Sequence, residues 1–263
     1  MSALKVDFFV IGVARGGTTS LYHYLQQHPD IFLPKVKECN FFSEVESMDE
    51  SVYEDPKPGK EYHMKIIRSP KVYQSLYSEA RLDQLKGEIS PAYVWDAGSA
   101  QKILQHNPEA RLIVSLRNPI ERAFSHYLMH FQTGYEKAPT FEEALKAPKR
   151  EIWGGGNQYL EMGLYFEQLK AYFDLFPPEH IKVLVSEEWT RNNGEALNEI
   201  YGFLGLGAIS HQDLEATHNA SVQLKNKGLL DLLRSQKIKR SINKVLPQKT
   251  KEKLMEQLFH KEA

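Results

Sequence analysis

A run of glycine and hydroxyl residues near the start of the chain has the composition of a phosphate-binding loop. An apolar run ends at Gly12, and the letters GVARGGTTS lead from it into a helix-like segment. The P-loop pattern G-x-x-x-x-G-K-[ST] fits Gly12, Gly17 and Thr19, but Thr18 stands where the pattern has lysine. A cation, Arg15, comes three residues earlier. The spacing therefore predicts a phosphate cradle whose positive charge has moved along the chain.

The chemistry open to this loop is anion binding. A glycine-rich turn between a strand and a helix exposes successive backbone N–H groups, and the helix N-terminus adds positive potential. Three hydroxyl donors follow the second glycine, and an arginine contributes a planar fork that is always charged. The candidate ligands are Arg15, Gly16, Gly17, Thr18, Thr19 and Ser20. The missing lysine argues against an ordinary ATPase or GTPase. The alternative is a tight turn whose glycines serve geometry alone.

The elements that must position this loop alternate along the chain. Strand patterns are expected at 5–13, 85–95, 111–116 and 181–189, and helical spacing at 19–28, 68–80, 158–175, 193–205, 228–236 and 248–259. Another helix should follow Asn118 and Pro119, because asparagine is a good N-cap and proline favours the first helical position. The alternation predicts an α/β fold with a mainly parallel central sheet flanked by helices, including a P-loop-like strand-loop-helix unit. Ligands bind such sheets beyond the carboxyl ends of the strands, where GVARGGTTS and SLRNPIERAFS both fall.

The composition is that of an ordinary globular protein without a strong overall charge. Of its 263 residues, 41% are hydrophobic and 25% charged, and the formal net charge is −1. A nearly neutral chain has no bulk field for nucleic acid or an anionic membrane, and no apolar stretch approaches the ~20 residues that span a bilayer. The single cysteine, Cys39, excludes an internal disulfide and is typical of a reducing compartment. We expect a cytoplasmic protein without membrane or nucleic-acid partners.

The glycine-rich loop resembles the 5′-phosphosulfate loop of sulfotransferases that use 3′-phosphoadenosine-5′-phosphosulfate (PAPS). In that family lysine or arginine precedes x-G-T-T or x-G-T-S, and the run from Arg15 to Thr19 matches this order. Lysine is usual in the heparan-sulfate branch and arginine is a familiar bacterial variant. The chain is therefore similar to bacterial enzymes of the heparan-sulfate and natural-product branch. The resemblance implies that the cation contacts the leaving 5′-phosphate.

Two further segments complete the nucleotide site that the resemblance implies. SLRNPIERAFSHY resembles the 3′-phosphate-binding stretch, in which an arginine at a strand end and a serine eight residues later hold the phosphate; here these are Arg117 and Ser125. HNASVQLKNKGLL is similar to a late basic loop that closes over the nucleotide, with Lys225 and Lys227 as candidates. Taken alone, Arg117 is equally consistent with a surface ion pair, and the lysines with the start of a solvated helix.

Two segments between these loops carry the implied catalytic chemistry and complete the match. KECNFF resembles the family's K-E-x-x-F-F segment, whose glutamate, here Glu38, is the catalytic base. GEISPAYVW resembles the G-E-K-S-P-x-Y strand, with Ile89 where a lysine often stands. The resemblance covers about residues 5–205, the core of one predicted domain that comprises the whole chain. It is weakest in the basic segment 210–263, which we expect to help cover the nucleotide.

The resemblance implies transfer of a sulfuryl group from PAPS to an acceptor hydroxyl, or to an amine, which leaves adenosine 3′,5′-bisphosphate. By analogy with phosphoryl transfer, positioning and electrostatic stabilisation should supply most of the catalysis. Glu38 is the expected base, and Arg15 with the loop amides should stabilise the leaving 5′-phosphate. Histidine is the base in other sulfotransferase branches. The alternatives to Glu38 as the base are therefore His63, His126, His130 and His218, of which His63 is the first candidate. No metal-ligand spacing is present, and no metal is predicted.

The acceptor site is expected to be aromatic. Its candidate lining residues, in loops, are Tyr62, His63, Tyr93, Phe131, Tyr135, Trp153 and Tyr159. The lack of a dense Lys/Arg groove favours a small molecule, such as a natural-product scaffold, over a polyanionic glycan. Two other functions stay open: a small-molecule kinase or NTPase, and a nucleotide-binding protein without catalysis. The kinase or NTPase is disfavoured by the missing lysine and by the lack of a Mg²⁺-holding aspartate after RLIVSL. The presence of Glu38 argues against a protein that only binds nucleotide.

Overall fold

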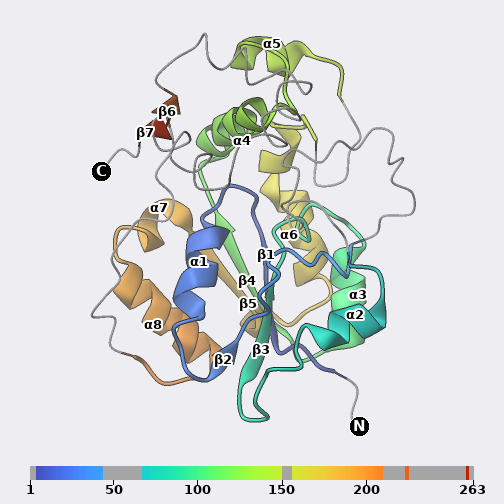
Figure 1. Ribbon diagram of the computed structural model, residues 1–263, viewed down its shortest axis with the longest axis vertical. Helices are drawn as coiled ribbons and strands as arrows, with labels where there is room; N and C mark the ends of the chain where they lie inside the picture. Colours follow the sequence, from blue (N-terminus) through green and yellow to red (C-terminus); the bar gives the residue numbers. More distant parts are fainter. Residues whose placement is uncertain (1–3, 44–66, 150–155, 210–222, 225–258, 261–263) are drawn as a thin grey trace, which may run out of the picture. The chain divides into compact units, whose positions relative to one another are not determined.

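The computed structural model describes residues 4–43, 67–149, 156–209, 223–224 and 259–260 (Figure 1). The chain divides into two compact units, Met1–Glu215 and Ala216–Ala263. In the second unit the described residues form an antiparallel pair of short strands, β6 (Gln223–Leu224) and β7 (Phe259–His260). That both units form the one predicted domain stays a prediction.

The first unit is built on a five-stranded sheet in the order β2-β3-β1-β4-β5. Its strands are β1 (Phe8–Gly12), β2 (Ile31–Phe32), β3 (Leu85–Ile89), β4 (Arg111–Leu116) and β5 (Ile181–Val185). Every neighbouring pair is parallel, and β1 lies between β3 and β4, with Phe8 opposite Gly87 on one side and Arg111 on the other. The predicted α/β fold with a parallel central sheet is confirmed.

Helices connect these strands. The described α-helices are α1 (Thr18–Leu25), α2 (Pro70–Ser75), α3 (Ser99–His106), α4 (Pro119–Thr133), α5 (Phe141–Lys146), α6 (Tyr165–Phe173), α7 (Ser186–Trp189) and α8 (Asn193–Leu204), with short 3-10 turns at η2 (Glu161–Gly163) and η3 (Pro178–His180). Helix α4 begins as predicted: the Asn118 side chain accepts from the amides of Ile120 and Glu121, and Pro119 is the first helical residue.

The bounds of several expected elements differ, and the strand expected at 85–95 ends at Ile89, before Pro91. The helix expected at 68–80 is limited to α2, and the strand expected at 181–189 ends at Val185, where the chain turns directly into α7. The helix expected at 158–175 starts later, because Gly163 lies tightly against Pro119 and a 3-10 turn precedes α6. The helix expected at 228–236 lies outside the described residues, as does all but the last residue of the one expected at 248–259.

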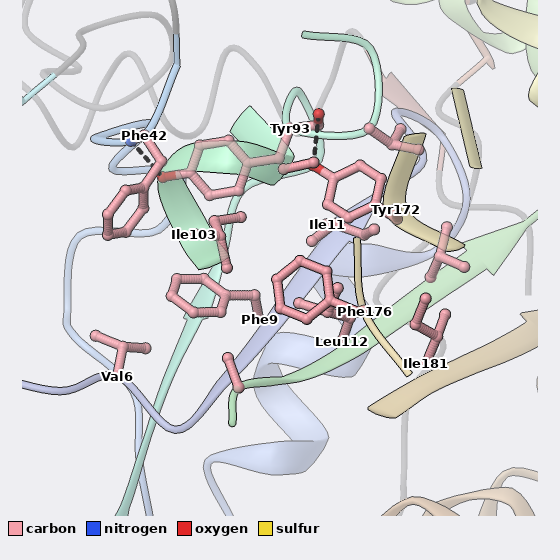
Figure 2. Packing of buried hydrophobic residues seen from close by; sticks show 14 of the residues in the cluster. Val6, Phe9, Ile11, Phe42, Tyr93, Ile103, Leu112, Tyr172, Phe176 and Ile181 are labelled. Atoms are coloured by element: carbon pink, nitrogen blue, oxygen red, sulfur yellow. Dashed lines mark hydrogen bonds between the residues drawn. The ribbon is translucent and has the colours of Figure 1, made fainter. Parts of the chain in front are cut away.

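Side chains of β1 point alternately to the two faces of the sheet. Phe9 and Ile11 pack with residues of α2, α3 and α6 (Figure 2), and Phe8 and Val10 pack with residues of α1 and α8. Figure 1 shows these two groups of helices on opposite sides of the strands. Because burial of each such side chain stabilises the fold by roughly 1.5–3 kcal/mol, the central strand is fixed from both faces. Its carboxyl end is therefore a firm base for the loop that follows.

Candidate active site

The loop between β1 and α1 is packed too closely for any residue but glycine at two positions. A Cβ on Gly16 would overlap the backbone carbonyl oxygen of Ser115, and one on Gly17 would lie 2.6 Å from Cζ2 of Trp189. Gly17 is also the N-cap of α1, with φ 85°, a left-handed conformation that costs glycine little. Arg15 adopts the same region with φ 69°, which is unusual for a residue with a side chain. The two glycines are therefore required by the backbone geometry of the loop, and Arg15 is held within its turn.

A serine on β4 and a distant tryptophan hold this loop in place. The hydroxyl of Ser115 donates to the Gly16 carbonyl at 2.6 Å and accepts from Nε1 of Trp189 at 2.8 Å. The amide of Val13 donates to the Ser115 carbonyl at 3.0 Å. Sequence reasoning did not identify Ser115 or Trp189, since they lie about 100 and 170 residues beyond the loop and belong to no local pattern.

Helix α1 starts with the three hydroxyl residues. Thr18 and Ser20 are buried and Thr19 is exposed. The first N–H groups of a helix have no acceptor one turn earlier and carry its positive potential. The loop therefore offers backbone donors and a solvent-facing hydroxyl close to the exposed residue Arg15.

The structure brings the predicted 5′-loop and the predicted 3′-segment into direct contact. Nε of Arg15 donates to the hydroxyl of Ser125 at 2.9 Å, and its NH1 lies 3.7 Å from the sulfur of Met129, one turn further along α4. NH1 of Arg117 donates to the backbone carbonyl of Arg15 at 3.3 Å. This contact follows from the sheet order, because β1 and β4 are adjacent and parallel and their carboxyl ends meet at one edge.

Two guanidinium groups share this edge. Although Arg15 is exposed as a residue, the protein groups around its guanidinium displace water, and this desolvation, and next the positive charge of Arg117, lowers the pKa of Arg15, while the carboxylate of Glu38 raises it. Arginine nevertheless stays charged at neutral pH. Arg117 forms an ion pair with Glu121 at 3.4 Å, with a partly exposed geometry that is worth little. Two positive charges that share a strand end create a local potential that attracts anions.

The backbone of Arg117 is fixed by two groups that sequence reasoning missed. The hydroxyl of Tyr165 on α6 donates to the Arg117 carbonyl at 2.8 Å. The amide of Asn118 donates to Oε1 of Glu187 on α7 at 2.8 Å. Three helices thus converge on the turn between β4 and α4.

Glu38 lies in the loop that follows β2. Its side chain is 27% exposed and forms an ion pair with Lys37, whose side chain is 15% exposed. The backbone of Glu38 is left-handed, with φ 63°, and its amide donates to the carbonyl of Ile89 at the end of β3 at 2.9 Å. The side-chain amide of Asn40 donates to the Glu38 carbonyl at 2.8 Å. The carboxylate of Glu38 also raises the pKa of Arg15, against the two larger effects that lower it; that the predicted base and the predicted cation act in one site stays a prediction.

Two of the predicted acceptor residues lie inside the fold. Tyr93 is fully buried and donates to Glu88, and Tyr159 is fully buried and donates to Glu136 at 2.9 Å. We therefore correct the assignment of these two tyrosines from acceptor lining to core. Phe131 packs, partly buried, against the cluster that contains Tyr159, and its place in the acceptor site stays a prediction. Outside the described residues lie Tyr62, His63, Trp153, Lys225 and Lys227.

Two of the alternative histidine bases are also internal. His126 and His130 are buried on α4, with their Nε2 atoms 3.1 Å apart. Burial, and next the neighbouring His130 and Arg122, lowers the pKa of His126 well below its ordinary value. Of the four alternatives, these two are remote from solvent, and His63 and His218 lie outside the described residues.

Comparison with known proteins places this arrangement in a family. The family described as "Sulfotransferase domain" matches residues 5–261. Human carbohydrate sulfotransferase 15 is 24% identical over 251 residues, which cover 78% of this chain and 44% of that protein. Human heparan sulfate glucosamine 3-O-sulfotransferase 6 is 26% identical over 204 residues, which cover 76% and 52%. The chain thus spans about half the length of these curated relatives.

Solved structures agree. A sulfotransferase from Alicyclobacillus acidocaldarius superposes with a TM-score of 0.67 at 31% identity, over 82% of this chain and 87% of that one. The sulfotransferase domain from the curacin biosynthetic pathway, at 14% identity, has a TM-score of 0.54 over 82% and 80%, which shows a shared fold. The chain belongs to the sulfotransferase family, whose members use PAPS, as the loop motifs predict.

None of the helices in the described residues has the length and apolar character needed to cross a bilayer. In the same part of the chain, no group of three or more His, Cys, Asp or Glu side chains is arranged to hold a metal ion.

Proposed function

We propose that the protein transfers a sulfuryl group from PAPS to the hydroxyl of a small acceptor molecule, or to an amine, and releases adenosine 3′,5′-bisphosphate. The observation that carries the proposal is the contact of Arg15 with Ser125 and Arg117 at the carboxyl ends of β1 and β4. Family membership supports the reaction class. A kinase of the P-loop type is disfavoured because Thr18 replaces its lysine.

The donor set of the site fits the anionic groups of PAPS. The α1 amides, the hydroxyls of Thr18, Thr19 and Ser20, and the backbone of Gly16 and Gly17 would hold the 5′-phosphosulfate together with Arg15. Arg117 and Ser125 would hold the 3′-phosphate, an arginine and a hydroxyl being strong partners for a phosphate. Lys225 and Lys227, which lie outside the described residues, remain proposed further nucleotide contacts. We propose no metal, since the guanidinium groups and helix amides supply the positive charge.

In the proposed reaction the acceptor oxygen forms the new O–S bond while the S–O bond to the 5′-phosphate breaks. Glu38 takes the proton from the acceptor hydroxyl, so the attacking oxygen gains electron density as the bond forms. Arg15 and the loop donors stabilise the negative charge that accumulates on the leaving phosphate. PAPS supplies a sulfuryl group that is already activated. The protein therefore contributes to catalysis by positioning the reactants and stabilising charge.

We propose a hydroxylated small molecule, such as a natural-product scaffold, as the acceptor. The chain has a formal net charge of −1, so it has no bulk positive field suited to a polyanionic glycan. The names of two relatives specify carbohydrate or heparan sulfate acceptors, and one structural neighbour comes from a biosynthetic pathway. A screen with sulfur-labelled donor against both compound classes separates them: label on small hydroxylated compounds supports the proposal, and label on glycans alone contradicts it. Tyr62 and His63 remain proposed acceptor contacts, and a cytoplasmic location remains a prediction.

Calorimetry tests the donor assignment. Adenosine 3′,5′-bisphosphate should bind in the absence of divalent metal, and ATP with Mg²⁺ should bind at least about tenfold more weakly, a difference of about 1.4 kcal/mol. Tighter binding of Mg·ATP would overturn the proposed reaction in favour of an NTPase or kinase.

A further inference from the structure

A fully buried carboxylate stands behind the loop that carries the proposed base. Glu88, on β3, is 0% exposed. It accepts three hydrogen bonds: from the hydroxyls of Tyr73 at 2.5 Å, Tyr93 at 2.5 Å and Ser90 at 2.7 Å. Burial raises the pKa of Glu88, and the three donors oppose that shift. A buried carboxyl is costly unless it is well hydrogen-bonded, so this one needs a structural or functional reason.

Two of the three partners also hold the loop. The hydroxyl of Ser90 accepts from the amide of Asn40 at 3.1 Å, and the hydroxyl of Tyr93 accepts from the amide of Phe42 at 3.1 Å (Figure 2). A hydroxyl has one proton to donate and lone pairs to accept with. Both hydroxyls donate to Glu88, so both protons point inward toward its carboxyl group. The lone pairs of Ser90 and Tyr93 are then left facing the two loop amides.

The loop needs such support because its backbone is strained. Glu38 has φ 63° and Asn40 has φ 52°, and a left-handed conformation costs a residue with a side chain of order 1–3 kcal/mol. The amide of Glu38 is bound to the Ile89 carbonyl, and its own carbonyl accepts from the Asn40 side chain. The contacts of Ser90 and Tyr93 fix the amides two and four residues after Glu38. Together these bonds fix the backbone from which the Glu38 side chain extends.

We propose that Glu88 is a positioning residue for Glu38: by orienting the hydroxyls of Ser90 and Tyr93 it holds the strained loop that aims the base at the acceptor. This inference rests on the proposed function. Tyr73 provides the internal control. Its hydroxyl reaches Glu88 from α2, its ring stacks on Phe41, and among the described residues it has no loop amide as a partner.

Single-hydroxyl deletions test the inference, since Glu88→Leu risks loss of the fold. Hydrogen exchange of the free enzyme measures the protection of the loop amides directly and requires neither PAPS nor turnover. Ser90→Ala and Tyr93→Phe should raise exchange at the amides of Asn40 and Phe42, respectively, about tenfold. They should also lower kcat about tenfold and leave the affinity for adenosine 3′,5′-bisphosphate within about twofold. Tyr73→Phe should keep loop exchange and kcat within about twofold of the parent.

A double variant separates failure of this inference from failure of the proposed function. In a Glu38→Gln background, added Tyr93→Phe should cause no further loss of kcat, because both changes act on one group. If Tyr93→Phe lowers kcat equally in both backgrounds, the positioning role is overturned. It is also overturned if Ser90→Ala and Tyr93→Phe change loop exchange and kcat no more than Tyr73→Phe does. Full turnover by Glu38→Gln overturns instead the choice of base in the proposed function.

Discussion

At the scale of single residues, the candidate site is defined by the positions of its charged side chains. The P-loop lysine position is occupied by Thr18, and the cation is Arg15, whose side chain reaches Ser125 on the neighbouring strand-helix unit. A guanidinium presents several donors in a plane, whereas a lysine is a point charge. One residue can therefore contact both a loop-bound anion and the hydroxyl of α4.

The proposed base makes a sharp prediction at this scale. Glu38→Gln should lower kcat by about 10²–10⁴-fold, because the amide cannot take the acceptor proton. The affinity for adenosine 3′,5′-bisphosphate should stay within about twofold, since Glu38 is not among the proposed nucleotide ligands. The measurements are steady-state turnover with an acceptor from the labelled-donor screen, and calorimetry.

Glu79→Gln is the matched control for this prediction. Glu79 also forms an ion pair with a lysine, Lys35, at 2.9 Å, but both side chains are exposed. Its replacement should leave kcat unchanged. If the two variants behave alike, the base lies elsewhere, and His63 becomes the first candidate.

At the scale of elements, the strand-helix units could be predicted and the contacts between them could not. The apolar run before Gly12 and the Asn118-Pro119 helix start are local signals, and both elements form as expected. Tyr93 was assigned to the acceptor site because its segment has loop-like punctuation. Its partner, Glu88, belongs to the strand motif GEISP, but the hydrogen bond between the two side chains is not visible in the sequence. Ser115 and Trp189 were missed for the same physical reason: their hydrogen bonds join distant parts of the chain.

The close approach of the loop to β4 predicts a large effect at Gly16. Gly16→Ala should destabilise the protein by about 1–3 kcal/mol, because its Cβ would overlap a backbone oxygen that cannot move easily. Gly202→Ala, in the interior of α8 with open space around the new Cβ, should stabilise by roughly 0.5–1 kcal/mol. Urea denaturation measures both. Equal effects of the two substitutions would contradict the tight packing of the loop.

Helix α4 predicts a pH dependence of stability. Burial and the neighbouring His130 and Arg122 hold the pKa of His126 well below 6.5, so His126 is neutral in the fold, whereas in the unfolded chain it binds a proton below about pH 6.5. The unfolded state then holds more protons, and the free energy of unfolding should fall with acidification. The slope reaches at most about 1.4 kcal/mol per pH unit for this group.

His126→Gln removes that titration and checks its origin. Urea unfolding between about pH 7 and about pH 5.5 should show a shallower decline for the variant than for the parent. Identical slopes would mean that other groups cause the acid sensitivity, and that burial of His126 does not contribute to it.

At the scale of the whole molecule, anion binding comes from arrangement and not from net charge. The chain carries 33 Lys and Arg residues against 34 Asp and Glu. Its parallel sheet nevertheless brings two strand ends together so that Arg117 contacts the backbone of Arg15, and the amide of Glu38 is bound at the end of the neighbouring strand β3. The sheet order β3-β1-β4 is what makes one site from three segments that are far apart in sequence.

The central claim is that the carboxyl edge of the sheet binds two phosphates, one at the 5′ position and one at the 3′ position of the nucleotide. The most direct measurement compares the Kd of adenosine 3′,5′-bisphosphate with that of adenosine 5′-monophosphate in the parent protein and in Arg117→Ala. The parent should prefer the bisphosphate by about 10²-fold, and Arg117→Ala should lose most of that preference, as expected for a charge-assisted contact worth about 1.5–3 kcal/mol. Arg81→Ala, which removes a surface arginine paired with Asp83, should retain it. Equal affinity of the parent for both nucleotides would contradict the account.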